Sequence, residues 1–219
     1  MEIIQITDLH ISRDINQEKH DCCPYERLKH SLSEIKRNHG NDASLVITGD
    51  LSSDYSRESY ENIKTLLKQY RFQISLLPGN HDDLNNMKGI CDDKISLDRM
   101  NIKNSNFSAH NIDTHIQDNI RGCIKDNDMK EIKNEIEKTK ENVIFFTHHP
   151  LIKINSLWID KNITENNNTL IQCMLKRSDL LFFIFSGHVH QEFHHKINNV
   201  EFFTSPSSCY QFKSETDDF

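Results

Sequence analysis

The chain repeatedly places a short apolar run directly before a cluster of Asp, Asn or His beside Gly or Pro. Short runs rich in Ile, Val, Leu and Phe are typical of buried β-strands. Five such runs can be recognised, each named here with the residues that follow it: 3–7 with Asp8, 45–48 with Gly49 and Asp50, 74–77 with Asn80, 142–147 with His148, and 180–185 with His188 and His190. In open α/β sheets, ligands bind at the carboxyl ends of strands. We therefore expect the five clusters to meet at one edge of a sheet.

Helical periodicity fills the intervals between these runs. After Pro24, which suits a first helical turn, Leu28, Leu32 and Ile35 recur at helical spacing until Gly40. Similar patterns predict three further helices, over residues 60–70, 128–138 and 170–176. This alternation of strands and helices favours an α/β layered fold.

The rest of the chain gives weaker signals. Residues 112–116 and 200–204 predict two more strands, the polar stretch 82–106 predicts helix and loop without finer detail, and 153–168 predicts a long loop. The sequence contains no internal repeat and no linker that would separate two domains. We therefore predict that residues 1–219 form a single domain.

Composition limits the partners and the compartment. The net charge is −7 and the pI is near 6.0, so no basic field exists to attract polymeric nucleic acid. No apolar run approaches the roughly 20 residues that span a bilayer, and the N-terminus does not resemble a signal peptide. The six cysteines form no C-x-x-C pair. We expect a reduced cytoplasmic protein with neither a nucleic-acid nor a membrane partner.

The chain contains thirteen histidines, and several of them lie in the clusters that follow the strands. Asp8 and His10 are two residues apart, so an extended strand end would place both side chains on the same face. Together they offer one ion an oxygen and a nitrogen. His188 and His190 repeat this spacing, and each is expected to reach a different ion.

The middle clusters add further candidate ligands. Gly49 allows a sharp turn that places the Asp50 carboxylate where it could bridge two ions. The amide oxygen of Asn80 is a neutral ligand, which leaves His81 free as a general acid. Asp82 is expected to hold the other ring nitrogen of His81.

This set of nitrogen and oxygen ligands, without thiolate, suits Zn, Mn, Fe or Co. Two such ions about 3.5–4 Å apart clamp phosphoryl oxygens and lower the pKa of a bridging water. The expected chemistry is therefore in-line displacement at phosphorus. An anionic substrate would receive its positive charge from these ions, because the chain as a whole is acidic.

The ordered motifs D-x-H, G-D, G-N-H-D, H-x-P and G-H-x-H resemble those of the calcineurin-like metallophosphoesterase superfamily, over residue 1 to about residue 190. The resemblance implies an αββα four-layer sandwich, with two mostly mixed β-sheets flanked by helices. It implies two ions of Fe, Mn, Zn or Co. By motif position, the first ion would be held by Asp8, His10, Asp50 and His190, and the second by Asp50, Asn80, His148 and His188.

The same resemblance implies roles for the neighbouring residues. His81 would contact the phosphate and protonate the leaving oxygen, and Asn80, His81 and His190 would bind the substrate. The H-x-P spacing selects His148 rather than His149 as a ligand. Asp82 and His149 would support the ligands from behind, although simple packing explains His149 equally well.

Further segments resemble bacterial class III cyclic-nucleotide phosphodiesterases. They are residues 49–60, 77–82, 156–160 and 204–213. The implied substrate is a small nucleotide, 3′,5′-cyclic AMP, opened to 5′-AMP by a metal-bridging hydroxide. Chains of that subfamily continue for several strands beyond 211–213, so we expect a C-terminally shortened sandwich. Its exposed sheet edge could pair with a second copy as a homodimer.

Several alternatives remain at this stage. A phosphomonoesterase or a nucleotide-polyphosphate hydrolase would use the same metal centre. A non-catalytic scaffold is disfavoured because no ligand position is substituted. Trp158 is either a stacking surface for a base or a loop anchor, and Cys209 is more often a packed thiol than a nucleophile. The remaining histidines are expected to have surface or packing roles: His20, His30, His39, His110, His115, His194 and His195.

Overall fold

The computed structural model describes residues 2–41, 43–97, 102–103 and 107–213. Parts of the predicted helix-and-loop stretch, residues 98–101 and 104–106, lie outside the described residues. So does the chain end, residues 214–219, on which the predicted C-terminal shortening depends.

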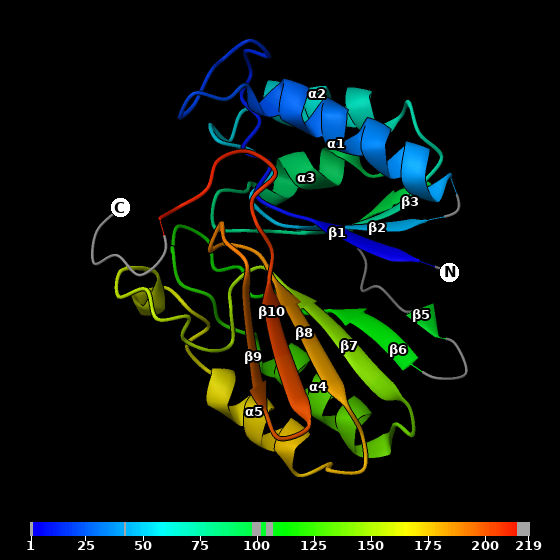
Figure 1. Cartoon of the computed structure of the whole chain (residues 1–219), viewed down its shortest axis with the longest axis vertical. Coiled ribbons are helices and arrows are strands. Elements are labelled where there is room, and N and C mark those ends of the chain that lie inside the picture. Colours follow the sequence, from blue (N-terminus) through cyan, green and yellow to red (C-terminus); the bar gives the residue numbers. More distant parts are fainter. Residues whose placement is uncertain (1, 42, 98–101, 104–106, 214–219) are drawn as a thin grey trace.

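Two β-sheets lie face to face at the centre of the molecule (Figure 1). The first sheet has the order β1-β2-β3-β4 and is parallel throughout. Its strands are β1 (Ile3–Ile6), β2 (Ser44–Thr48), β3 (Gln73–Leu77) and β4 (Ile95–Ser96). Apolar side chains dominate these strands because helices cover one face and the second sheet covers the other.

The second sheet has the order β5-β6-β7-β8-β10-β9 and is mixed. Its strands are β5 (Ile102–Lys103), β6 (Phe107–Asn111), β7 (Asn142–Thr147), β8 (Phe182–Ser186), β9 (Phe193–Ile197) and β10 (Val200–Thr204). The four inner strands run parallel, and β5 and β9 pair antiparallel at the two edges.

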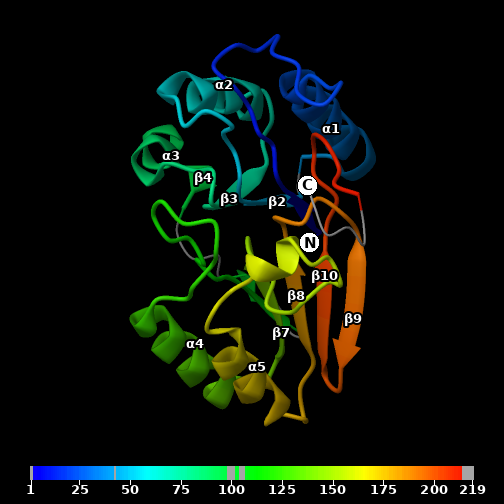
Figure 2. The same ribbon diagram turned by 90° about the vertical axis from the view of Figure 1, so that its left-hand side faces the viewer.

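Helices cover the outer face of each sheet, as Figures 1 and 2 show from two directions. The first sheet carries α1 (Pro24–His39), α2 (Arg57–Leu67) and α3 (Leu84–Ile90), and the second carries α4 (Asp126–Lys138) and α5 (Asn167–Leu175). A short 3₁₀ helix, η1 (Ile159–Lys161), lies in the long loop before α5. The order of layers is helix, sheet, sheet, helix, which confirms the predicted αββα sandwich.

Local sequence explains where these helices begin and end. In α1, Pro24 occupies the first turn, Leu28 and Leu32 are fully buried, and Gly40 ends the helix at φ 72°. In α2, the Ser56 side chain accepts a hydrogen bond from the Ser59 amide, which satisfies one of the free donors of the first turn.

One predicted strand was misplaced and three strands were not predicted, for physical reasons. Strands β4 and β5 are only two residues long each and lie in the stretch 82–106, which was predicted as helix and loop. The strand expected at 112–116 lies earlier, as β6, and an Asx turn follows it: the Asp113 carboxylate accepts a hydrogen bond from the His115 amide. Strand β9 was not predicted. It is an edge strand whose His194, His195 and Lys196 are exposed, so its sequence lacks apolar alternation.

The clusters that follow the strands do meet, but not at one edge of one sheet. Strands β1, β2 and β3 bring their carboxyl ends from the first sheet, and β7 and β8 bring theirs from the second. A hydrogen bond joins the two sets: the His188 backbone amide donates to the Asp8 side-chain carboxylate at 3.0 Å. The candidate site therefore lies where the ends of two stacked sheets converge.

The sheets pack on each other through a small apolar cluster. Its buried members are Val46, Leu77, Ala109 and Phe146, with Ile3, Phe107, Ile144 and Phe185 partly buried around them. The Phe146 and Phe185 rings stack with their centroids 5.6 Å apart. Because this cluster joins the two sheets, we expect residues 1–219 to unfold as one unit.

Replacing Phe146 tests this expectation. Phe146→Ala removes a ring that is 3% exposed, and we expect it to lower the free energy of unfolding by about 3–5 kcal/mol. Urea unfolding followed by far-UV circular dichroism and by fluorescence of Trp158, the single tryptophan, should give coincident transitions.

The control is Leu181→Ala, because Leu181 is 43% exposed. Its effect on the free energy of unfolding should stay within about 0.5 kcal/mol. Two separate transitions in the parent protein would contradict the single-unit expectation.

Candidate metal centre

The residues that follow the strands leave the extended conformation at once. Five candidate ligands have left-handed backbones: Asp8 (φ 54°), His10 (φ 49°), Asp50 (φ 51°), His188 (φ 70°) and His190 (φ 50°). The extended geometry expected for Asp8 and His10 was therefore wrong. A left-handed backbone at a non-glycine residue costs on the order of 1–3 kcal/mol, and such residues cluster at functional sites.

Two glycines allow candidate ligands to lie close against the backbone. Gly49 has φ 95°, and a Cβ there would overlap the His148 ring. A Cβ at Gly79 would overlap the Asp50 carboxylate. Glycine at these positions lets the chain after β2 lie against His148 and the chain after β3 lie against Asp50.

One group of candidate ligands consists of Asp8, His10 and His190, all buried. The Nε2 atoms of His10 and His190 are 3.1 Å apart, and Asp8 Oδ1 lies 3.3 Å from His190 Nε2. His190 Nδ1 donates to the Tyr210 carbonyl at 2.8 Å. That bond fixes the ring and leaves the Nε2 lone pair directed at the other two side chains.

A second group lies beside it and consists of Asn80, His148 and His188. Asn80 Oδ1 is 3.2 Å from His148 Nε2 and 2.9 Å from His188 Nδ1. His148 Nδ1 donates to the Thr48 carbonyl at 2.7 Å. As in the first group, a backbone carbonyl fixes the ring and leaves Nε2 available.

Asp50 lies between the two groups, and each of its carboxylate oxygens faces one of them. Oδ2 is 3.7 Å from His10 Nε2, and Oδ1 is 3.3 Å from His148 Nε2. Oδ1 also accepts a hydrogen bond from the His81 amide at 2.8 Å. The structure thus brings all seven predicted ligands together, as two groups of three with Asp50 between them.

The chemistry of these donors fits cations. Burial lowers the pKa of both His10 and His188 to about 3, so their rings are neutral and able to ligate. Although burial opposes it, the interactions with His190 lower the pKa of Asp8. Within the described part of the chain, the buried Nδ1 of His10 has no hydrogen-bond partner. Converging lone pairs on imidazoles and carboxylates are satisfied when a positive ion lies among them.

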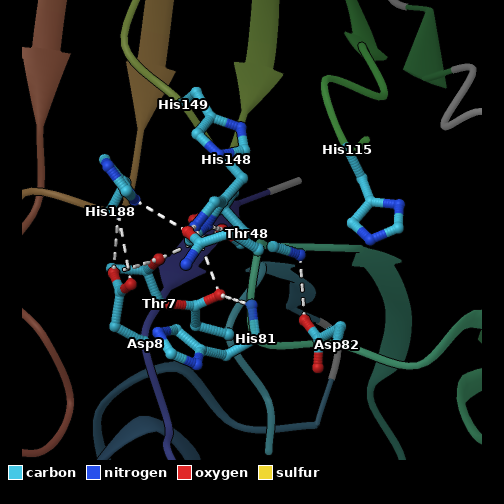
Figure 3. Close-up of polar contacts among 12 residues, drawn as sticks. Thr7, Asp8, Thr48, His81, Asp82, His115, His148, His149 and His188 are labelled. Carbon is cyan, nitrogen blue, oxygen red and sulfur yellow. Dashed lines mark hydrogen bonds and ion pairs between the residues drawn. The ribbon is translucent and has the colours of Figure 1, made fainter. Parts of the chain in front are cut away.

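His149 lies next to His148, at the edge of the second group (Figure 3). Its ring meets that of His148 edge-on at a centroid distance of 4.8 Å. Its Nδ1 is 2.9 Å from the Thr114 hydroxyl, and its Nε2 donates to the Ile120 carbonyl at 3.0 Å. Although its nitrogens lie close enough to those of His148 and His188 to join a metal cluster, both are occupied by these bonds. The contacts favour support of His148 over ligation.

The predicted pairing of Asp82 with His81 was wrong. Figure 3 shows Asp82 away from the His81 ring. Its carboxylate instead accepts hydrogen bonds from the Gly79 amide at 2.9 Å and the Leu51 amide at 3.0 Å, and from the Tyr60 hydroxyl at 3.0 Å. Burial, followed by the charge of Asp50, raises the pKa of Asp82 to about 7. Asp82 therefore ties the loop after β2 to the loop after β3.

The partner of His81 is Tyr55, which sequence reasoning missed. The Tyr55 hydroxyl is 3.3 Å from His81 Nδ1 and 3.5 Å from the Asn80 carbonyl. Tyr55 is 47% exposed and has a left-handed backbone, φ 58°. A bulky residue in that conformation is a signal of function that only the structure reveals.

The C-terminal segment, residues 205–213, also contributes contacts that were not predicted. Tyr210 stacks on His10 at 5.3 Å, and Phe212 stacks on His190 at 4.1 Å between ring centroids. Trp158 packs edge-on against Phe212 at 4.8 Å. These aromatic rings form a wall beside the first group of ligands.

Of the histidines given surface or packing roles, His20 packs against the Tyr210 ring at a centroid distance of 4.5 Å. Others contact carboxylates elsewhere. Buried His110 is 3.2 Å from the Glu135 carboxylate, and exposed His39 contacts Glu2 at 2.8 Å. Across the ranges the structure describes, no helix has both the length and the apolar character to cross a membrane.

Comparisons with known proteins agree with this geometry. Curated relatives include a 3′,5′-cyclic-nucleotide phosphodiesterase of Nostoc sp., 29% identical, with 100% of this chain and 82% of the relative covered. They also include a 3′,5′-cyclic adenosine monophosphate phosphodiesterase of Haemophilus influenzae, 24% identical, with 98% and 79% covered. Among solved structures, a dimetal phosphatase from Danio rerio has a similar fold. Its TM-score is 0.72 at 12% identity, with 94% of this chain and 87% of that chain covered.

A family model described as calcineurin-like phosphoesterase matches residues 1–192. That range contains all seven candidate ligands as well as His81. The chain therefore belongs to the calcineurin-like phosphoesterase family, whose members are metal-dependent phosphoesterases.

Proposed function

We propose that this protein is a dinuclear-metal phosphodiesterase that opens 3′,5′-cyclic AMP, or a related small cyclic nucleotide, to the 5′-nucleotide. One observation carries the proposal: the two oxygens of Asp50 face imidazoles of two different ligand groups, at 3.7 Å and 3.3 Å. A carboxylate in that position is suited to bridge two ions. The names of the relatives from Nostoc and Haemophilus support the substrate class.

In the proposed site, Asp8, His10 and His190 would hold the first ion, Asn80, His148 and His188 would hold the second, and Asp50 would be shared. Two ions of Mn, Fe, Zn or Co would supply an activated water as nucleophile and positive charge for the phosphoryl oxygens. The chain itself fixes the ligands, because carbonyls of Thr48 and Tyr210 orient two of the imidazoles.

His81 is the proposed proton donor to the leaving oxygen. Its ring is half-buried and lies edge-on to His10 at a centroid distance of 5.6 Å, so it borders the first ligand group without belonging to it. The ribose oxygen of a cyclic nucleotide would leave as a strongly basic alkoxide unless it is protonated. A nearby imidazole supplies that proton.

Tyr55 positions His81 in this proposal. A protonated His81 ring donates from Nδ1 to the Tyr55 oxygen, and the Tyr55 hydroxyl donates onward to the Asn80 carbonyl, consistent with the contacts of 3.3 Å and 3.5 Å. This arrangement leaves the Nε2 proton for the leaving group. Tyr55 thus replaces the carboxylate that the sequence suggested.

A hydrolysis screen tests the proposed function. Protein stripped with EDTA should be inactive, and Mn, Fe, Zn or Co should restore hydrolysis of cyclic AMP, cyclic GMP and bis-p-nitrophenyl phosphate. Faster hydrolysis of the bis-ester than of p-nitrophenyl phosphate would favour a diesterase over a monoesterase. If the metal-replete protein left every diester intact, the proposal would fall.

Asp50→Ala tests the bridge. Because both ions would share this carboxylate, we expect bound metal, measured by plasma mass spectrometry, to fall below about one ion per chain. Hydrolysis of every ester should be lost with it. Asp179→Ala is the matched control, since Asp179 is exposed and contacts Arg177 at the protein surface. If the Asp50→Ala variant kept its full metal content, the proposal that Asp50 is shared by two ions would be contradicted.

His81→Ala separates proton donation from metal binding. We expect the metal content to be unchanged and the turnover of cyclic AMP to fall about 10²–10⁴-fold. Bis-p-nitrophenyl phosphate should lose much less, because p-nitrophenolate leaves without a proton. His30→Ala, on the exposed side of α1, serves as the control. Equal losses on both substrates would argue against a donor role.

Tyr55→Phe keeps the ring and removes the hydroxyl that contacts His81. We expect turnover of cyclic AMP to fall roughly 3- to 10-fold, equivalent to one hydrogen bond of about 1 kcal/mol. Bis-p-nitrophenyl phosphate turnover should change little. In a His81→Ala background the second substitution should add no further loss, and an additive loss would show that Tyr55 acts independently of His81.

A further inference from the structure

Two buried cysteines meet behind the metal centre although 187 residues separate them in the sequence. The sulfur atoms of Cys22 and Cys209 are 2.8 Å apart, and each residue is 8% exposed. Cys22 lies just before α1, and Cys209 lies in the segment 205–213 that follows β10. Disulfide sulfurs are about 2.05 Å apart, so these sulfurs need to approach by only about 0.8 Å to be bonded.

The backbone holds both cysteines in place. Lys19 and Cys22 exchange two backbone hydrogen bonds, of 2.8 Å and 3.1 Å, which close a tight turn. On the other side, the Cys209 amide donates to the Ser207 hydroxyl at 3.0 Å. The Ser208 amide donates to the Thr7 carbonyl at 2.9 Å, at the end of β1. The short sulfur–sulfur distance is therefore built into two anchored segments.

The segment that carries Cys209 also supports the candidate ligands. The Ser207 hydroxyl donates to the Asp8 carbonyl at 2.8 Å. In the same segment, the Tyr210 carbonyl accepts the hydrogen bond from His190, and the Tyr210 ring stacks on the His10 ring. The Lys19 ammonium lies 5.2 Å from the centre of the Tyr210 ring. A link between Cys22 and Cys209 would thus fasten this segment beside the first ligand group.

The other four cysteines have different surroundings. All four are only partly buried. The thiol of Cys23 donates to the Ile15 carbonyl, that of Cys91 to the Met87 carbonyl, and that of Cys123 to the Ile124 carbonyl. Cys23 is the neighbour of Cys22 in the sequence, so it offers a matched control for any reaction of the buried pair.

We propose that Cys22 and Cys209 are a thiol–disulfide site, and that their oxidation cross-links the C-terminal segment to the loop before α1. The oxidant is a low-molecular-weight disulfide. One cysteine thiolate attacks a sulfur of that molecule, forms a mixed disulfide and releases one small thiol. The thiolate of the second cysteine then attacks the sulfur of the first, forms the protein disulfide and releases the second small thiol.

The step is balanced and reversible. Two protein thiols lose two electrons and two protons, and the small disulfide becomes two thiols. Burial, and then the contact with Cys22, raise the pKa of the Cys209 thiol. The reaction should therefore be slow at neutral pH and faster in mildly alkaline buffer, because the thiolate is the attacking species.

The test uses the full chain with its metals restored, incubated with oxidised glutathione at pH 8.5 and then with an alkylating reagent. We expect the intact mass to show loss of two hydrogens and the number of alkylated thiols to fall from six by two. Peptide mapping without reductant should recover Cys22 joined to Cys209. Dithiothreitol should restore the parent mass.

The cross-linked protein should also unfold at a higher temperature than the reduced protein, because the link closes nearly the whole chain into one loop. It should release metal to EDTA more slowly, since the segment beside His190 and His10 is fastened. Neither readout depends on which ester the protein hydrolyses, so the inference can fail or hold independently of the proposed function.

Single substitutions decide between specific and incidental oxidation. Cys22→Ser and Cys209→Ser should each abolish the cross-link and the thermal shift, whereas Cys23→Ser should keep both. If a serine variant does not fold, the peptide map of the parent protein still decides. Recovery of only glutathione adducts, of a link through Cys23, or of six free thiols would overturn the proposal.

Discussion

The rest of the site depends on how the buried carboxylate of Asp50 is compensated by its neighbours. This carboxylate is buried where the ends of the two sheets converge, and burying an isolated carboxylate is strongly unfavourable unless partners satisfy it. One oxygen accepts a hydrogen bond from the His81 amide, and the two oxygens face imidazoles brought by β1 and β7. The proposed ions would complete this compensation. Groups from the ends of both sheets thus surround the negative charge of Asp50.

The same reasoning explains why the structure keeps so much local strain. Five candidate ligands have left-handed backbones, at a cost of on the order of 1–3 kcal/mol each. The surrounding sandwich must supply that energy until a ligand does. A ligand that binds the folded state but not the unfolded state stabilises the folded state. Bound metal would therefore offset this strain. Function and stability are therefore coupled at these strand ends.

Much of this arrangement could be predicted from the sequence, because the strong signals are local. Apolar runs predicted β1, β2, β3, β7, β8 and β10, and periodic Leu and Ile predicted α1. The polar clusters that follow the strands identified the seven residues that the structure brings together. Strand β9 could not be found, because an exposed edge strand needs no apolar pattern. The convergence of two sheets, rather than one edge, depends on long-range packing that no local window contains.

The contacts that orient the site were harder to predict for a different reason. His148, His149 and His190 each donate to a backbone carbonyl, those of Thr48, Ile120 and Tyr210 respectively. A carbonyl is present in every residue, so nothing in the sequence marks which one will serve. The error over His81 has the same origin, since Asp82 stood next to it in sequence while Tyr55 stood next to it in space. Motifs thus identify the candidate ligands, whereas the fold selects the groups that fix their orientation.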